Sequence, residues 1–352
     1  MIRLGASFSL IMAVVLSIGC SSSGSPGTGG SGGTAGASGT AGSGGASGRG
    51  GTAESIIDAM VASVDAARYE ADLTSVAQVR NLDSQAWQDT QDFCAERLDE
   101  LGFVVERQAY ATGVNVIGTL AGANDEQIIV SAHYDAVPDC IGADDNASGI
   151  AGILEVARAL TMAEYERTLV VACWDEEEVG LLGSFAYANR AIDNGTDIPG
   201  MYSFDMIGYK SDEPNTQLLP PGIDILFPEE AAELEANEFR GDFIALIADE
   251  SSRALNDAFE QYADSVELPW VELEVPDGIL TNPIAGDLQR SDHAAFWLVG
   301  YPGIQVTDSA NFRNPNYHCA GGPDTIESLD TDFAVKVIKS VVGATATELG
   351  VR

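Results

Sequence analysis

The feature that most constrains this fold is the alternation of short, continuously apolar runs with longer amphipathic segments. Two runs, QIIVSA at 127–132 and TLVVACW at 168–174, are typical of strands buried on both faces of a sheet. Between them, residues 148–163 place their large aliphatic side chains on one helical face. This alternation predicts strands joined by helical crossovers.

The same patterns predict the remaining elements and a fold class. Residues 210–238 are rich in Pro, Glu and Asn, which predicts an excursion or lid rather than core. We predict an α/β fold, a three-layer α/β/α sandwich around a mixed, mostly parallel central sheet. Ligands of such sheets bind beyond the C-terminal ends of the strands. The other predicted strands are 103–110, 115–121, 200–205, 243–248, 270–275 and 303–306, and the other helices are 55–67, 83–102, 182–192, 251–263, 293–298 and 333–349.

The first 51 residues differ in composition from the rest. Arg3 and the apolar run 8–18 predict a signal peptide over 1–19, too short to remain as a membrane span. The stretch that ends at Cys20 resembles a bacterial lipobox, so we expect lipid on Cys20, with plain cleavage nearby or a retained thiol as the alternatives. Residues 20–51, almost entirely Gly, Ser, Thr and Ala, predict a flexible linker, and 52–352 predict one folded domain.

The formal net charge of −37 argues against nucleic acid and anionic membrane surfaces as partners. The lipid on Cys20 is then the one expected attachment to a membrane. We expect an exported monomer, either a cell-envelope lipoprotein or a secreted protein.

Histidines are scarce, and two acidic clusters accompany them. His133, His293 and His318 are the only three, and a lone histidine is more often structural than a ligand. However, Asp144-Asp145 lies between a strand and a helix, and 175–178 is a run of four acids directly after a buried strand. One residue would suffice as a helix cap, and adjacent buried carboxylates are costly without a cation. The combination predicts a pair of divalent metals bridged by one carboxylate.

These motifs resemble those of the secreted bacterial two-zinc aminopeptidases of the leucyl aminopeptidase type. The superfamily also holds glutaminyl cyclases and glutamate carboxypeptidase-like domains. The resemblance covers roughly 75–330, and the matching stretches, in family order, are NVIGTLAG, VSAHYDAV, GADDNASGIAGILEVARAL, EEEVGLLGS, FDMIGY, RSDHAAF and NPNYHCAGGPDT. It implies that 52–352 is a catalytic domain holding two zinc ions, with calcium as a further candidate. The implied zinc ligands are His133, Asp145, Glu178, Asp205 and His318, with Asp145 bridging the ions.

The resemblance also implies roles for the carboxylates around these ligands. Asp135 orients His133, and Glu177 is the general base. Asp144 is not a ligand, and Glu176 is an extra acid that we interpret as structural.

Three further expectations concern the neighbourhood of the site. By the same resemblance, Tyr317 and Arg290 match positions at which some relatives place groups that hold the substrate carbonyl or its developing oxyanion. His293 is expected to be a neutral histidine of the site wall. The resemblance implies a cis peptide bond after Asp145.

Two expectations concern cysteines. Cys140 and Cys319 lie close in sequence to proposed ligands, and we predict a disulfide between them. Cys173 lies in an apolar run and is predicted to be a buried small hydrophobe.

The function implied is hydrolysis of the amino-terminal bond of peptides that carry a free amino terminus. Zinc would polarise the scissile carbonyl while Glu177 takes a proton from the attacking water and returns it to the leaving amine. Glutaminyl cyclisation is one alternative. A carboxypeptidase is another and would use a cation such as Arg290 or Arg313. A tethered binding domain with a degenerate site is the non-enzymatic alternative.

Overall fold

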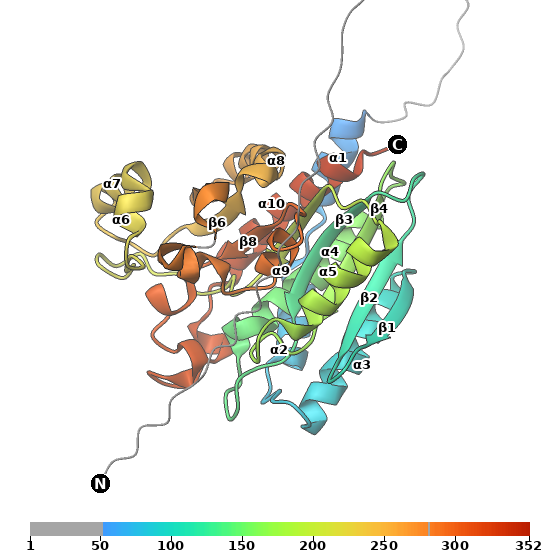
Figure 1. The fold of residues 1–352 in the computed structure, drawn as a ribbon, viewed down its shortest axis with the longest axis horizontal. Helices are drawn as coiled ribbons and strands as arrows, with labels where there is room; N and C mark the ends of the chain where they lie inside the picture. The colour runs from blue at the N-terminus through green and yellow to red at the C-terminus, as the bar shows by residue number, and fades with distance from the viewer. Residues whose placement is uncertain (1–51, 281) are drawn as a thin grey trace, which may run out of the picture. The chain divides into compact units, whose positions relative to one another are not determined.

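The structure, a computed structural model, describes residues 52–280 and 282–352. The predicted signal peptide, Cys20 and the linker lie outside the described residues. The described strands form one eight-stranded sheet in the order β1-β2-β4-β3-β5-β8-β6-β7 (Figure 1). Their bounds are β1 (Val104–Ala109), β2 (Val114–Leu120), β3 (Gln127–His133), β4 (Thr168–Trp174), β5 (Gly200–Phe204), β6 (Ile244–Asp249), β7 (Trp270–Val275) and β8 (Ile304–Thr307).

Neighbouring strands in this sheet are mostly parallel. The pairs β3–β4, β3–β5, β5–β8 and β6–β7 run parallel. The pairs β1–β2, β2–β4 and β6–β8 run antiparallel. The predicted mixed, mostly parallel α/β sheet is therefore confirmed, and the carboxyl ends of β3, β4, β5 and β8 meet at one edge.

Helices cover both faces of the sheet, as the side-chain alternation of β3 shows. Ile128 and Val130 join the core packed by α1 (Ala53–Ala62), α2 (Ala66–Val76), α3 (Gln85–Glu100), α4 (Gly149–Leu160), α8 (Arg253–Ser265) and α10 (Thr331–Leu349). Ile129 points the opposite way, into the core packed by α5 (Leu182–Asn194) and α9 (His293–Trp297). This arrangement gives the three expected layers (Figure 1).

The predicted excursion over 210–238 is partly helical. It contains α6 (Ile223–Leu226) and α7 (Pro228–Ala236). Ile223 packs in one cluster with Ile247 of β6, while Leu234 packs with Phe243 and Ala245. The segment therefore covers the β6 end of the sheet, on the face opposite α8 and α10.

Two sequence predictions about local structure were wrong. The helix predicted over 55–67 is two helices, because Asp65 caps α2 by accepting from the backbone N–H groups of Ala67 (2.9 Å) and Arg68 (3.4 Å). Cys173 is fully buried but is not a free hydrophobe. It lies in β4 with its Cα 6.7 Å from that of Cys94 in α3, and the two form a disulfide.

The predicted Cys140–Cys319 disulfide is confirmed, and it joins residues 179 positions apart. Within the described part of the chain, no helix combines the length and the apolar character needed to cross a membrane.

Candidate metal centre

The proposed ligands converge at the edge where the parallel strands end. His133 is the last residue of β3, and Asp205 directly follows β5. Glu178 lies in the loop after β4, and Asp145 lies just before α4. His318 lies in a short turn after β8. Strand ends and loops from distant parts of the sequence thus bring all five side chains together.

The five side chains form two groups that share one carboxylate. We call His133, Asp145 and Asp205 the strand-end cluster, and Asp145, Glu178 and His318 the loop cluster. In each cluster, one ligand atom from every member lies within 4.8 Å of the others.

Asp145 offers one oxygen to each cluster. Its Oδ1 lies 3.4 Å from Nε2 of His133, which is itself 3.7 Å from Oδ1 of Asp205. Its Oδ2 lies 3.3 Å from Nε2 of His318, which is 3.2 Å from Oε2 of Glu178. This is the arrangement expected of a carboxylate that bridges two ions.

The residues present fit zinc. Ligand atoms 2.0–2.2 Å from a tetrahedral zinc lie about 3.4 Å from one another, close to the separations found. Among the described residues, Nε2 of His318 and Oε1 of Glu178 are buried without a hydrogen-bond partner. Burial and the charge of Asp145 raise the pKa of the Glu178 carboxyl to about 7. A divalent cation would satisfy these atoms and remove the charge conflict.

Asp135 contacts residues of both clusters. It is fully buried, and its Oδ1 lies 3.4 Å from Nδ1 of His133. Its two oxygens accept hydrogen bonds from the backbone N–H of Glu177 (3.1 Å) and of Glu178 (3.2 Å). One carboxylate therefore faces a ligand on β3 and fixes the loop that carries another ligand and the proposed base.

Glu177 faces the strand-end cluster. Its Oε2 lies 3.9 Å from Nε2 of His133, and the residue lines the pocket beside Asp145 and Asp205. Burial raises the pKa of its carboxyl well above the usual value, although the imidazole of His133 opposes the shift. A raised pKa suits a group that must both accept and return a proton near neutral pH.

Three polar residues of the quoted motifs lie outside both clusters. Asp144 is fully buried and accepts from the backbone N–H of Gly208 (3.0 Å) and from a side-chain amide (3.1 Å). Glu176 accepts from the hydroxyl of Thr112. His293 lies 3.0 Å from the carbonyl of Leu288, and burial lowers its pKa to about 4.

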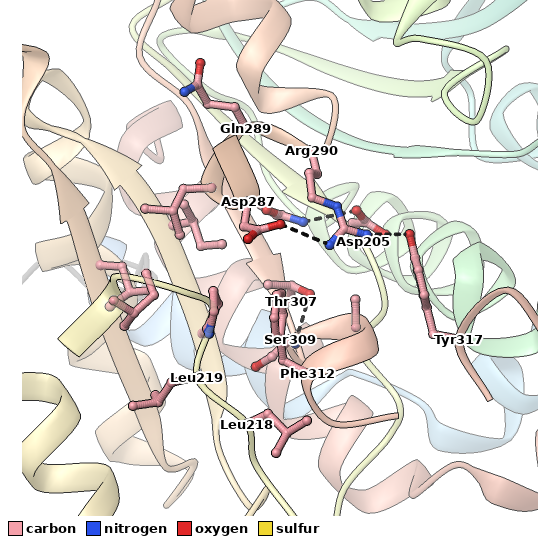
Figure 2. A pocket seen from close by; sticks show the side chains of 18 of the residues that line it. Asp205, Leu218, Leu219, Asp287, Gln289, Arg290, Thr307, Ser309, Phe312 and Tyr317 are labelled. Carbon is pink, nitrogen blue, oxygen red and sulfur yellow. Dashed lines mark hydrogen bonds and ion pairs between the residues drawn. The ribbon is translucent and has the colours of Figure 1, made fainter. Parts of the chain in front are cut away.

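The two predicted substrate-binding residues line the pocket and contact each other (Figure 2). Arg290 donates to the hydroxyl of Tyr317 (2.8 Å) and to Asn311 (2.7 Å), and it lies 3.6 Å from Asp287. The Tyr317 ring stacks on the imidazole of His318 at 3.8 Å. Burial and the charge of Asp145 raise the pKa of the phenol, which therefore keeps its proton.

Sequence reasoning missed Arg80, a fully buried arginine behind the Asp145 loop. Its guanidinium donates to the carbonyls of Tyr134 (3.0 Å), Ile141 (2.8 Å) and Gly142 (2.9 Å). Its Nη2 also lies 3.4 Å from the carbonyl oxygen of Asp145. The guanidinium also donates to the nearby carbonyls of Val76 (2.8 Å) and Gln78 (3.0 Å), but its other partners lie far away in sequence, so no local pattern marks this residue.

Asp324 was also missed, although it is the second-to-last residue of a quoted motif. Its Oδ2 accepts from the backbone N–H of Asp144 (2.9 Å) and of Asp145 (3.1 Å). Its position six residues after a proposed histidine ligand was the available signal. The expected cis peptide is present between Asp145 and Asn146.

The pocket next to the clusters has a volume of about 420 Å³. Its floor is one face of β8, β6 and β7, where Thr307 pairs with Ala245 and Ala245 pairs with Val271. Its roof comes from the segment after β5 and includes Leu218 and Leu219 (Figure 2). With strands about 4.8 Å apart, this floor extends about 10 Å from β8 to β7.

Comparison with known sequences gives a family match. The model of peptidase family M28 matches residues 115–345. The uncharacterized protein YfbL of Escherichia coli is 29% identical over 240 residues, covering 65% of this chain and 69% of that protein. A probable leucine aminopeptidase of Trichophyton verrucosum is 26% identical over 323 residues, covering 84% of this chain and 76% of that protein.

Solved structures share the fold. The LapA aminopeptidase of Legionella pneumophila superposes with a TM-score of 0.65 at 17% identity, covering 85% of this chain and 73% of that one. A glutaminyl cyclase of Porphyromonas gingivalis superposes with a TM-score of 0.54 at 15% identity, covering 83% and 98%.

Proposed function

The chain belongs to peptidase family M28, whose members are hydrolases, and we propose that it is a two-zinc aminopeptidase with Glu177 as general base. The observation that carries the proposal is the pair of ligand clusters sharing Asp145 beside a pocket of about 420 Å³. His133 and Asp205 would hold one ion, Glu178 and His318 the other, and Asp145 both.

Bound zinc would lower the pKa of a water and polarise the scissile carbonyl. The side chains of the chain supply the rest. Glu177 accepts a proton from the water as it attacks and delivers that proton to the amine that leaves. Asp135 holds the backbone of Glu177 through the 3.1 Å hydrogen bond, which keeps the base in place throughout.

Tyr317 is the proposed donor to the oxyanion that develops on the carbonyl. Its hydroxyl accepts from Arg290 at 2.8 Å, which leaves its own proton free to donate towards the substrate. The stacking of its ring on His318 places this donor next to the loop cluster.

Replacing Glu177 by Gln tests the mechanism. The amide has nearly the same shape but cannot take a proton, so kcat should fall by about 10²- to 10⁴-fold while two zinc ions stay bound. Glu176→Gln is the matched control, because that neighbouring carboxyl contacts Thr112 and is expected to leave kcat near the wild-type value. Retained activity in Glu177→Gln would contradict the assignment.

The pocket supports peptides whose first residue is large and apolar. Its floor and roof carry Ala245, Val271, Leu218 and Leu219, and it begins at the metal ligands. Ala245→Phe should fill the floor and lower kcat/KM for phenylalanyl more than for alanyl nitroanilide substrates. An equal loss for both substrates would refute this substrate class.

The geometry gives little support to the carboxypeptidase alternative. Arg313 is buried and donates to Gln217 (2.8 Å) and to the carbonyl of Phe243 (2.6 Å). Arg290 is held by Tyr317 and Asn311. Peptides with a blocked amino terminus should therefore resist hydrolysis. The cyclase alternative needs one zinc, so the metal count and the product mass separate it.

We also propose that the protein is exported and attached through Cys20. The two disulfides support an oxidising compartment. Cys20→Ala should move the protein from the membrane fraction to the soluble exported fraction, and an unchanged distribution would count against a lipid anchor.

A further inference from the structure

The backbone at His318 departs from helical geometry. His318 and Cys319 both adopt left-handed conformations, with φ of 53° and 57°, in a single turn of 3-10 helix. Residues other than glycine rarely take this conformation, and neighbouring contacts must stabilise it where it occurs. His318 therefore depends on ties outside its own turn.

The nearest tie is covalent. Cys319, the residue after His318, is bonded to Cys140, which is 1% exposed. The residues just after Cys140, Ile141 and Gly142, are held at 2.8 and 2.9 Å by the guanidinium of Arg80. The disulfide thus anchors the His318 turn to a loop that is itself fixed from the core.

That same loop continues into Asp145, the shared ligand. The disulfide therefore fixes the distance between the two backbone segments that carry Asp145 and His318. The strand-end cluster has no such need, because His133 belongs to β3 and the backbone N–H of Asp205 donates to the carbonyl of Val306 at 3.1 Å.

We propose that the Cys140–Cys319 disulfide is a positioning device for the imidazole of His318, so that breaking it weakens zinc binding at the loop cluster and spares the strand-end cluster. The inference rests on the proposed two-zinc site. It assigns this bridge a role in metal retention, beyond the general stability that any disulfide adds.

The test compares two double variants of the full chain. Cys140→Ala/Cys319→Ala removes the bridge and leaves no thiol that could replace a ligand. Cys94→Ala/Cys173→Ala is the matched control, since it removes the disulfide between α3 and β4, which is next to no ligand in sequence. Zinc per chain is measured after equilibration with increasing concentrations of a chelator.

The first variant should lose one zinc at a chelator concentration about 10- to 100-fold below that needed for the wild type, and keep the other. The control should keep both at wild-type values. Wild-type retention of both ions in the first variant, or equal loss of both ions, would overturn the inference.

A second measurement covers the case in which the first variant does not fold. Wild-type protein loaded with two cobalt ions is treated with a phosphine reductant and alkylated, and mass spectrometry identifies the opened bridge. Cys319 is half-buried, whereas Cys94 and Cys173 are fully buried, so the Cys140–Cys319 bridge should open first. Loss of one cobalt signal should accompany its opening, and two unchanged signals would refute the proposal.

These outcomes separate the inference from its premise. A wild-type protein that binds fewer than two ions would contradict the two-zinc function itself. Two ions in the wild type together with two equally tight ions in the first variant would contradict the role of the disulfide alone.

Discussion

The two ligand clusters share Asp145 but take their other members from different kinds of backbone. In the strand-end cluster, His133 belongs to β3 and Asp205 follows β5, two strands that pair directly in the sheet. In the loop cluster, Glu178 and His318 lie outside the strands and the long helices. The histidine side chains differ accordingly, because His133 is 1% exposed and His318 is 35% exposed.

The difference shows how a site can be built at two levels of support. Ligands at strand ends take their positions from the hydrogen bonds of the sheet, which the fold forms in any case. Ligands on loops need dedicated contacts. Here the Asp135 carboxylate lies behind Glu178. The Cys140–Cys319 disulfide and Asp324 lie in the segment that carries His318. We therefore expect the loop cluster to be the more sensitive of the two to changes outside its ligands.

The largest effect should follow from removing what the clusters share. Asp145→Asn replaces the bridging carboxylate by a neutral amide, so both ions should be lost and activity should fall to background. Loss of a contact outside the ligands typically costs about 10- to 100-fold in affinity, and loss of a shared ligand should exceed this. Zinc content after dialysis measures the effect, with the exposed Asp139→Asn as control. One ion retained at full affinity would show that the clusters are independent.

Of the two clusters, the strand-end cluster is the one whose position the sequence predicted better. The strands at 127–132 and 168–174 were expected within one residue of β3 and β4, because strands buried on both faces carry an uninterrupted apolar pattern. His133 directly follows the first of these predicted strands and Asp205 ends the predicted strand at 200–205, so their position at the sheet edge followed from the fold class. Their assigned roles came from the resemblance to a family.

The supports of the loops could not be predicted in the same way. Arg80 and Asp324 hold the loop of Asp145 through bonds to backbone groups 54 to 180 positions away, and such partners leave no periodic or compositional mark. The antiparallel pairing of β6 with β8 and the Cys94–Cys173 disulfide are likewise set by tertiary packing. Local patterns report the elements, whereas these contacts exist only once distant elements have packed.

The next largest effect concerns the loop that carries the shared ligand. Arg80→Met keeps the length of the side chain but leaves the carbonyls of Tyr134 and Ile141 without their donor. At about 1–3 kcal/mol for each unsatisfied group, the free energy of unfolding should fall by at least about 2 kcal/mol. Calorimetry with and without zinc measures it, and Arg107→Met, which removes an exposed ion pair with Asp92, should cost less than about 1 kcal/mol. Equal costs would mean that the Asp145 loop needs no support from the core.

A smaller effect should fall mainly on the loop cluster. Asp324→Ala removes the acceptor for the N–H groups of Asp144 and Asp145 from the segment that also carries His318. The affinity for the more weakly held zinc should fall by about 10- to 100-fold. Asp330→Ala is the control, because it removes a carboxylate that caps α10 and should lower stability without altering zinc affinity. Unchanged zinc affinity in Asp324→Ala would mean that Asp324 does not support the loop cluster.

The smallest effect should come from the corresponding change at the strand-end cluster. Gln305→Leu removes the hydrogen bond that the amide donates to Oδ2 of Asp205 at 3.0 Å. Asp205 remains bonded through its backbone to Val306 of β8, and the lost hydrogen bond to its carboxylate, about 1.5–3 kcal/mol, already forms without zinc. Only the difference between the zinc-free and zinc-bound states lowers zinc affinity, so the loss should be about tenfold at most, or about 1.4 kcal/mol. A loss larger than that of Asp324→Ala would reverse the comparison, because it would mean that the sheet does not by itself hold its ligands in place.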